Sequence, residues 1–95
     1  MITVRFEEKT VTLSGHAGYA NRGQDIVCAA VSAILYVQVR LLQRENALED
    51  LHMEDGLVRL HLRKGARCDA LELGARWLGT EYPRCVRVID HNNLM

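Results

Sequence analysis

Apolar and polar residues alternate in two short stretches near the start of the chain, from Ile2 to Phe6 and from Val11 to about Ser14. Alternation with a period of two is typical of a strand that buries one face. We therefore predict two strands with a turn between them. The next stretch, residues 15–24, holds three glycines and follows neither the strand nor the helix period, so we predict a loop there.

From about Ile26 to Arg44 the apolar residues recur with the helical period. One stripe is apolar apart from Gln38, and further apolar positions such as Ala30 and Val37 widen the apolar surface beyond it. A helix that is apolar on more than one side must bury more than one side. In so short a chain, we expect a second subunit to provide part of that cover.

Two further segments, Leu48–Glu54 and Leu57–Arg63, flank the dipeptide Asp55-Gly56. We predict a hairpin with a two-residue type I′ turn, which needs positive φ at both central residues. In this register apolar residues face apolar ones and polar residues face polar ones, which a slip by one residue would not allow. The predicted pairs are Met53 with Val58, Leu51 with Leu60, His52 with Arg59, and Asp50 with His61.

Ala66 to Tyr82 shows helical spacing again and ends before Pro83, and Val86 and Val88 indicate a last strand. The predicted element order is therefore ββαββαβ. Hairpins favour a mainly antiparallel sheet with the two helices on one face, which is an α+β two-layer sandwich. We treat residues 1–95 as a single domain because the chain is short.

Charge and hydropathy narrow the range of partners. Twelve basic and twelve acidic side chains give a formal net charge of zero, whereas nucleic-acid binders usually carry a basic excess. We therefore expect no direct nucleic-acid partner. The N-terminal apolar segment is too short for a signal peptide, and Ser32, Gln38 and Arg40 interrupt the longest apolar region, Ile26 to Leu42. We expect no membrane span and no membrane partner.

The cysteine pattern predicts a reducing compartment. Three cysteines without a signal peptide argue for free thiols and a cytoplasmic protein. No C-x-x-C pair occurs, and we can assemble no set of three or four metal ligands, so we expect no metal and no cofactor. Cys68 and Cys85 are interpreted as packing residues, and His52 and His61 as residues on a solvated sheet face.

One histidine and one cysteine have a spacing that suggests chemistry. His16 lies in the glycine-rich loop, and Cys28 lies twelve residues later near the start of the first helix. A helix N-terminus favours the thiolate, which is the nucleophilic form of cysteine. If Asp25 is the N-cap, its carboxylate accepts the amide of Val27 or Cys28. His16 would then act as general base, and the first-turn amides are candidate donors to an oxyanion.

Each of these residues also has a plainer interpretation. A cysteine on an apolar helix is usually a small core residue, and a loop histidine is usually just solvated. Asp25 is more often a plain cap than an orienting group. Ser32, one turn after Cys28, is placed to hydrogen-bond back to the Cys28 carbonyl or to support the site. On spacing alone, a Cys–His hydrolase is one interpretation beside these.

A longer motif favours the hydrolase. The segments Gly15-His16-Ala17, Gly23-Gln24-Asp25-Ile26-Val27-Cys28-Ala29-Ala30 and Ser32-Ala33 resemble the signature of the ribosomal-processing cysteine protease family. The resemblance implies a cysteine endopeptidase that removes a short N-terminal extension from a large-subunit ribosomal protein. Cys28 and His16 would be its catalytic dyad, with Asp25 and Ser32 in supporting or helix-capping roles.

The resemblance also implies a homodimer, an apolar substrate groove and a mobile loop that becomes ordered over bound peptide. The predicted substrate-loop residues are Gly15, Ala17, Gly18, Tyr19, Arg22 and Gly23. Two other functions remain open. A non-catalytic, ribosome-associated assembly or binding module would not need the thiol, and another acyl-transfer hydrolase would use the same two residues.

Overall fold

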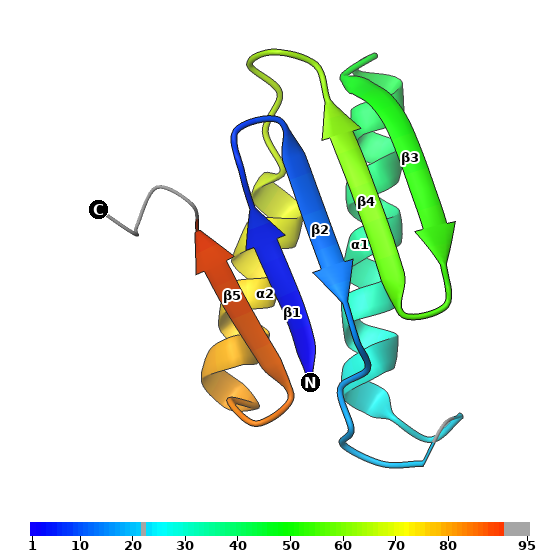
Figure 1. Cartoon of the computed structure of the whole chain (residues 1–95), viewed down its shortest axis with the longest axis vertical. Helices are drawn as coiled ribbons and strands as arrows, with labels where there is room; N and C mark the ends of the chain where they lie inside the picture. Colours follow the sequence, from blue (N-terminus) through cyan, green and yellow to red (C-terminus); the bar gives the residue numbers. More distant parts are fainter. Residues whose placement is uncertain (22, 91–95) are drawn as a thin grey trace.

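The computed structural model describes residues 1–21 and 23–90 of the chain. Its elements, in chain order, are β1 (Ile2–Phe6), β2 (Thr10–Ser14), α1 (Ile26–Arg44), β3 (Leu48–Glu54), β4 (Leu57–Leu62), α2 (Asp69–Glu81) and β5 (Val86–Asp90). The predicted order ββαββαβ is confirmed. The strands form one sheet with the order β3-β4-β2-β1-β5 (Figure 1).

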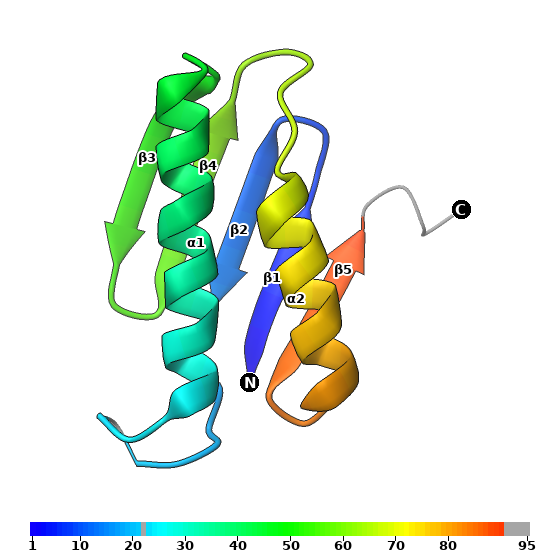
Figure 2. The same cartoon turned by 180° about the vertical axis from the view of Figure 1, so that it is seen from behind.

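The sheet is mainly antiparallel, as predicted. β1 pairs antiparallel with β2, β2 with β4, and β3 with β4, whereas β5 runs parallel to β1. Both helices cover the same face of this sheet (Figure 2). The molecule is therefore a two-layer α+β sandwich, and its core lies between the helices and the sheet.

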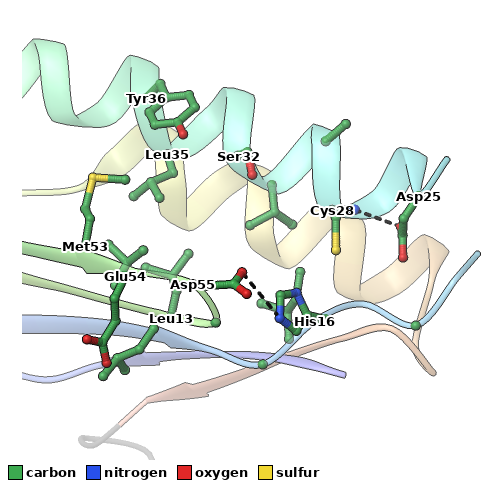
Figure 3. A pocket seen from close by; sticks show the side chains of 18 of the residues that line it. Leu13, His16, Asp25, Cys28, Ser32, Leu35, Tyr36, Met53, Glu54 and Asp55 are labelled. Atoms are coloured by element: carbon green, nitrogen blue, oxygen red, sulfur yellow. Dashed lines mark hydrogen bonds and ion pairs between the residues drawn. The ribbon is translucent and has the colours of Figure 1, made fainter. Parts of the chain in front are cut away.

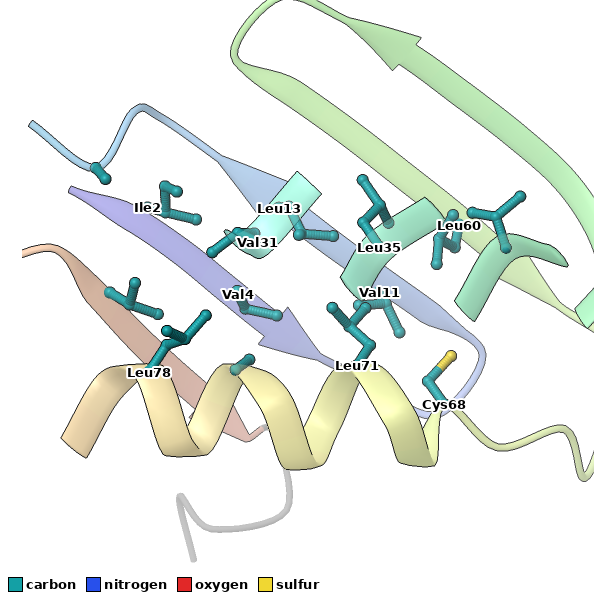
Figure 4. Close-up of a cluster of buried hydrophobic side chains, with 14 of the residues drawn as sticks. Ile2, Val4, Val11, Leu13, Val31, Leu35, Leu60, Cys68, Leu71 and Leu78 are labelled. Carbon is teal, nitrogen blue, oxygen red and sulfur yellow. The ribbon is translucent and has the colours of Figure 1, made fainter. Parts of the chain in front are cut away.

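The core is built from the alternating positions of the strands and the apolar stripes of the helices. Figure 4 shows Leu71 and Leu78 of α2 and Val31 and Leu35 of α1 directed towards the sheet. Their neighbours on the strands are buried as well: Ile2 and Val4 on β1, Val11 and Leu13 on β2, and Leu60 on β4. Burying one such side chain contributes about 1.5–3 kcal/mol, so this layer holds the two helices against the sheet.

The two helices also contact each other directly. Gly74 lies against Ile34, because a Cβ atom at position 74 would stand 2.6 Å from Ile34 Cδ1. Gln38, the polar exception in the stripe of α1, is only 2% exposed. Its Oε1 accepts a hydrogen bond of 3.0 Å from the backbone amide of Leu71, in the first turn of α2. The buried glutamine thus serves α2 as a cap supplied by another helix, since Cys68 makes no side-chain cap bond.

The β3–β4 hairpin has the predicted register but a different turn. The four predicted pairs are observed: Met53 with Val58, Leu51 with Leu60, His52 with Arg59, and Asp50 with His61. Gly56 has φ of 77°, but Asp55 is not among the residues with positive φ. The type I′ prediction is therefore wrong, because that turn needs positive φ at both positions.

The second helix is shorter than predicted. It begins at Asp69 rather than Ala66, and Cys68 occupies the N-cap position with non-helical φ of −115° and ψ of 55°. Cys68 is nevertheless buried, so its side chain continues the apolar spacing of the helix without belonging to it. Periodicity alone therefore overestimated the helix at its N-terminal end.

By length and composition alone, α1 is long and apolar enough to cross a membrane, with a mean hydropathy of 1.8. On those criteria, the polar residues that interrupt this segment do not by themselves exclude a span. Its stripe Val27, Val31 and Leu35 is instead buried in the core against the sheet. Core packing therefore accounts for the apolar character of this stripe.

Candidate active site

Asp25 fixes the start of α1. Its backbone is extended, with φ of −84° and ψ of 100°, and its Oδ1 accepts the amides of Val27 at 3.0 Å and Cys28 at 2.9 Å. The predicted N-cap is confirmed, and it binds both of the amides that sequence reasoning offered as alternatives. Capping satisfies two of the amide donors that every helix N-terminus leaves unpaired.

The second carboxylate oxygen of Asp25 holds the glycine-rich loop. Oδ2 accepts the amide of Tyr19 at 3.0 Å and that of Ala20 at 3.4 Å. Backbone hydrogen bonds, that of Cys28 first and then those of Tyr19, Ala20 and Val27, hold the pKa of Asp25 below its ordinary value of 3.8. One carboxylate therefore joins the helix start to the loop that carries His16.

The loop is also anchored on the side of α2. The rings of Tyr19 and Tyr82 meet edge to face, with centroids 5.6 Å apart and an interplanar angle of 86°. Tyr82 follows the last residue of α2. An aromatic pair of this geometry contributes about 0.5–1.5 kcal/mol, so Tyr19 links the loop to the second helix.

Cys28 is the third residue of α1 and is partly buried. Its Sγ accepts a hydrogen bond of 3.2 Å from the backbone amide of Ala17, which is itself buried. An amide donates more strongly to a thiolate than to a neutral thiol, because hydrogen bonds to ionised acceptors are stronger. The sulfur therefore lies at the N-terminal end of α1 with a backbone donor from the loop on it.

His16 follows β2 and faces the tip of the β3–β4 hairpin. The amide of Gly15 donates to the carbonyl of Gly56 at 2.9 Å, which ties the loop start to the hairpin. His16 Nε2 lies 3.7 Å from Asp55 Oδ1, with the two side chains 58% and 61% exposed. Sequence reasoning missed Asp55, since the Asp-Gly pair was fully explained as a turn.

Cys28 and His16 line the same cavity, of about 760 Å³. In Figure 3 the Cys28 sulfur is directed from α1 towards the side of the cavity where the His16 ring lies. Among residues 1–21 and 23–90, no hydrogen bond joins the two side chains. Catalytic hydrogen bonds are often long until substrate binds, so the shared cavity rather than a bond defines the pair.

The hairpin and α1 give the cavity an apolar wall. Its lining includes Leu13 on β2, Leu35 and Tyr36 on α1, and Met53 and Val58 on the hairpin. The predicted apolar groove therefore has a place in the fold beside Cys28. The contribution of the hairpin was not predicted, because the sequence does not show which strand ends meet the loop.

Three of the first-turn amides, which were predicted as candidate oxyanion donors, are held by Asp25. Val27 and Cys28 donate to the Asp25 side chain, and Ala29 donates to the Asp25 carbonyl at 3.1 Å. While the cap is intact, these three amides are already engaged. The role of first-turn amides as oxyanion donors stays a prediction, and a good cap competes with an oxyanion for Val27 and Cys28.

Other predicted site residues are placed as follows. Ser32 is exposed and lines the cavity, but within the described residues its hydroxyl makes no hydrogen bond to the Cys28 carbonyl. Gly18 and Gly23 line the cavity and have positive φ, at 72° and 91°. Arg22 lies outside the described residues. The structure thus brings Ser32, Gly18 and Gly23 to the cavity that Cys28 and His16 line.

The remaining cysteines and histidines lie elsewhere. Cys68 and Cys85 are buried, and burial, with Asp69 and then Glu72 nearby, raises the pKa of Cys68 to about 11. His52 is exposed on the hairpin, where its Nε2 lies 3.4 Å from a carboxylate oxygen of Glu54. In the described part of the chain, no group of three or more His, Cys, Asp or Glu side chains is arranged to hold a metal ion.

Comparison with known proteins identifies the family. The sequence model of the family "Cysteine protease Prp" matches residues 1–87. The chain belongs to the Prp family. It is 53% identical over 36 residues to the ribosomal processing cysteine protease Prp of Mycoplasma pneumoniae, a match that covers 38% of this chain and 36% of that protein. It is 35% identical over 65 residues to Prp of Staphylococcus aureus, covering 65% of this chain and 61% of that protein.

The chain thus spans less than two thirds of the length of the curated Prp relatives in these matches. Solved structures share its fold over nearly the whole chain. A crystal structure of S. aureus Prp in complex with a covalently linked product peptide has a TM-score of 0.82 and 24% identity, covering 95% of this chain and 99% of that one. A protein of Streptococcus mutans has a TM-score of 0.75 and 27% identity, covering 96% of each chain.

Proposed function

We propose that this Prp family member is a cysteine endopeptidase in which Cys28 is the nucleophile and His16 the general base. The observation that carries the proposal is the place of Cys28, in the first turn of α1 with the Ala17 amide on its sulfur, in the cavity that His16 also lines. S. aureus Prp, which shares the fold, has been crystallised with a covalently linked product peptide and with a substrate peptide.

The geometry supports a two-step acyl transfer. His16 takes the proton of the Cys28 thiol, and the thiolate attacks the carbonyl carbon of the scissile peptide bond. When the C–N bond breaks, His16 gives the proton to the leaving amine, and the acyl group stays on Cys28 as a thioester. His16 then deprotonates a water molecule that attacks the thioester, the C–S bond breaks, and the proton returns from His16 to the Cys28 sulfur. The products are a carboxylic acid and the free enzyme.

The proposed substrate is the N-terminal extension of a large-subunit ribosomal protein. Leu13, Leu35, Tyr36, Met53 and Val58 line the cavity, and such a wall suits an extended segment with apolar side chains. The name of the curated relatives, ribosomal processing cysteine protease, supports a ribosomal substrate. We propose a cytoplasmic site of action, where free thiols and ribosomes are both found.

We also propose that the protein acts as a homodimer. Leu73 and Trp77, four residues apart on α2, are 75% and 60% exposed, and Tyr36 and Val37 on α1 are each 56% exposed. Trp77 is therefore not a core residue. Exposed apolar side chains of this kind on neighbouring helices suit an interface between subunits. Sedimentation at micromolar concentration would show a single species of twice the chain mass, and a monomer would contradict the proposal.

The test is cleavage of a defined peptide. A peptide spanning the N-terminal extension of the ribosomal protein from the same organism is incubated with the protein, and the products are located by mass spectrometry. We expect one cut, after an apolar stretch, and no cut in a scrambled peptide of the same composition. His16→Ala should lose the activity while it keeps the circular dichroism spectrum of the parent.

Two other results would redirect the proposal. Hydrolysis of thioesters or simple amides without any peptide cleavage would point to another acyl-transfer hydrolase that uses the same dyad. Stable binding to ribosomal particles that thiol alkylation does not change, together with no hydrolysis, would favour a binding module without chemistry.

A further inference from the structure

The tip of the β3–β4 hairpin supplies a carboxylate that faces the imidazole of His16. Asp55 Oδ1 lies 3.7 Å from Nε2, and Figure 3 shows the two side chains directed towards one another. The neighbouring carboxylate, Glu54, points away from the ring in the same view and instead lies 3.4 Å from His52. We infer that Asp55 is a positioning residue, which selects the ring orientation and tautomer that let His16 act as a base on Cys28. The inference rests on the proposed function.

The backbone holds the two residues in this arrangement independently of their charges. The Gly15 amide donates to the Gly56 carbonyl at 2.9 Å, so the residue before His16 is bonded to the residue after Asp55. Gly56 also approaches the ring closely, since a Cβ atom there would stand 3.4 Å from His16 Nε2. The strand register adds a second constraint, because Ser14 on β2 pairs with Leu57 on β4. The carboxylate is therefore brought to the ring by the sheet.

The choice of nitrogen has a chemical consequence. A neutral imidazole carries one N–H, and a carboxylate beside Nε2 favours the tautomer with the proton on that nitrogen. The lone pair is then on Nδ1, which is free to take a proton from the thiol. The same carboxylate stabilises the imidazolium that forms when the thiol proton arrives, which is the role of the acid in a nucleophile–histidine–acid triad.

The expected effect is moderate because the pair is open to solvent. Both side chains are more than half exposed, and 3.7 Å is longer than a hydrogen bond of about 2.7–3.2 Å. A peptide that covers the cavity would exclude water and strengthen the interaction. We therefore expect Asp55→Ala to lower kcat by about 10- to 100-fold, less than the roughly 10⁴-fold loss known for a buried triad aspartate. KM should change little, because Asp55 acts through His16.

The test compares three variants in the cleavage assay. Asp55→Glu keeps a carboxylate that can accept from Nε2–H and stabilise the imidazolium, so it should recover most of the kcat lost in Asp55→Ala. Asp50→Ala is the matched control. Asp50 is an aspartate of the same hairpin and also pairs with a histidine, His61, but neither of these two residues lines the cavity. Asp50→Ala should match the wild type. An Asp55→Ala variant with wild-type kcat would overturn the inference.

A spectroscopic measurement separates this inference from the proposed function. The ¹⁵N shifts of the His16 ring are recorded in the Cys28→Ala background, above the pH range in which imidazole titrates. We expect the Nε2–H tautomer to dominate when Asp55 is intact and in Asp55→Glu, and to give way to a mixture in Asp55→Ala. Equal tautomer populations in all three would refute the positioning role. Failure of the wild type to cleave any peptide would refute only the proposed function, since the tautomer can be measured without substrate.

Discussion

Replacing Gln38 by methionine removes one hydrogen-bond acceptor from the contact between the two helices with little change in side-chain volume. Gln38 is 2% exposed, and its Oε1 accepts the amide of Leu71 in the first turn of α2. The N-cap residue Cys68 makes no side-chain cap bond, so the variant leaves the Leu71 amide buried without that acceptor. An unsatisfied buried donor costs about 1–3 kcal/mol.

For a domain of this size, each kcal/mol lowers Tm by about 4–8 °C, so Gln38→Met should melt at least about 4 °C below the wild type. The free energy of unfolding is measured by chemical denaturation at one protein concentration, because association would otherwise shift the result. Gln43→Met, an exposed change on the same helix, is the control and should stay within about 0.5 kcal/mol. Equal or higher stability of Gln38→Met would refute the assignment of Gln38 as the cap of α2.

Three further changes test the site. Gly15→Ala places a side chain at a residue with φ of 89° and against the Met1 carbonyl oxygen. The free energy of unfolding should therefore fall by at least about 1 kcal/mol, and an unchanged Tm would contradict this. The pKa of Asp25 lies below 3.8, so the ionised carboxylate stabilises the fold fully above pH 3.8, and this stabilisation is lost as the pH falls through the lowered pKa. The difference in Tm between the wild type and Asp25→Asn should therefore become smaller only in that acidic range. Iodoacetamide should alkylate Cys28 well before Cys68, because the Cys68 thiol is buried and has a pKa of about 11. Peptide mapping measures the order, and alkylation of Cys68 first would be incompatible with Cys28 as the nucleophile.

The sequence predicts the helices and strands well where burial of one face gives a clear period of apolar residues. The hairpin register follows from the sorting of apolar and polar residues, and the pair of Leu51 with Leu60 is observed as expected. Periodicity fails at the start of α2, because Cys68 is buried at the helical spacing while its backbone is not helical. The turn type failed for a related reason, since the Asp-Gly dipeptide is compatible with more than one turn geometry.

Cys28 and His16 were predicted to lie near each other and they line one cavity, but most of their surroundings were not predicted. The cap at Asp25 is a local interaction, and local interactions are readable from a short motif. Asp55 lies 39 residues after His16 and reaches it only because β4 pairs with β2, a neighbour relation that periodicity does not reveal. The hydrogen bonds from Tyr19 and Ala20 to Asp25 were not predicted either, because they depend on how the loop folds back.

The most direct test of the central claim is the cleavage rate of the extension peptide by wild type, Cys28→Ala and Cys68→Ala under the same conditions. The account predicts that Cys28→Ala falls to the uncatalysed background while it stays folded, and that Cys68→Ala cleaves the same bond whenever it is folded. Cleavage of that bond by folded Cys28→Ala at the wild-type rate would contradict the account, because no other thiol lines the cavity in the described residues.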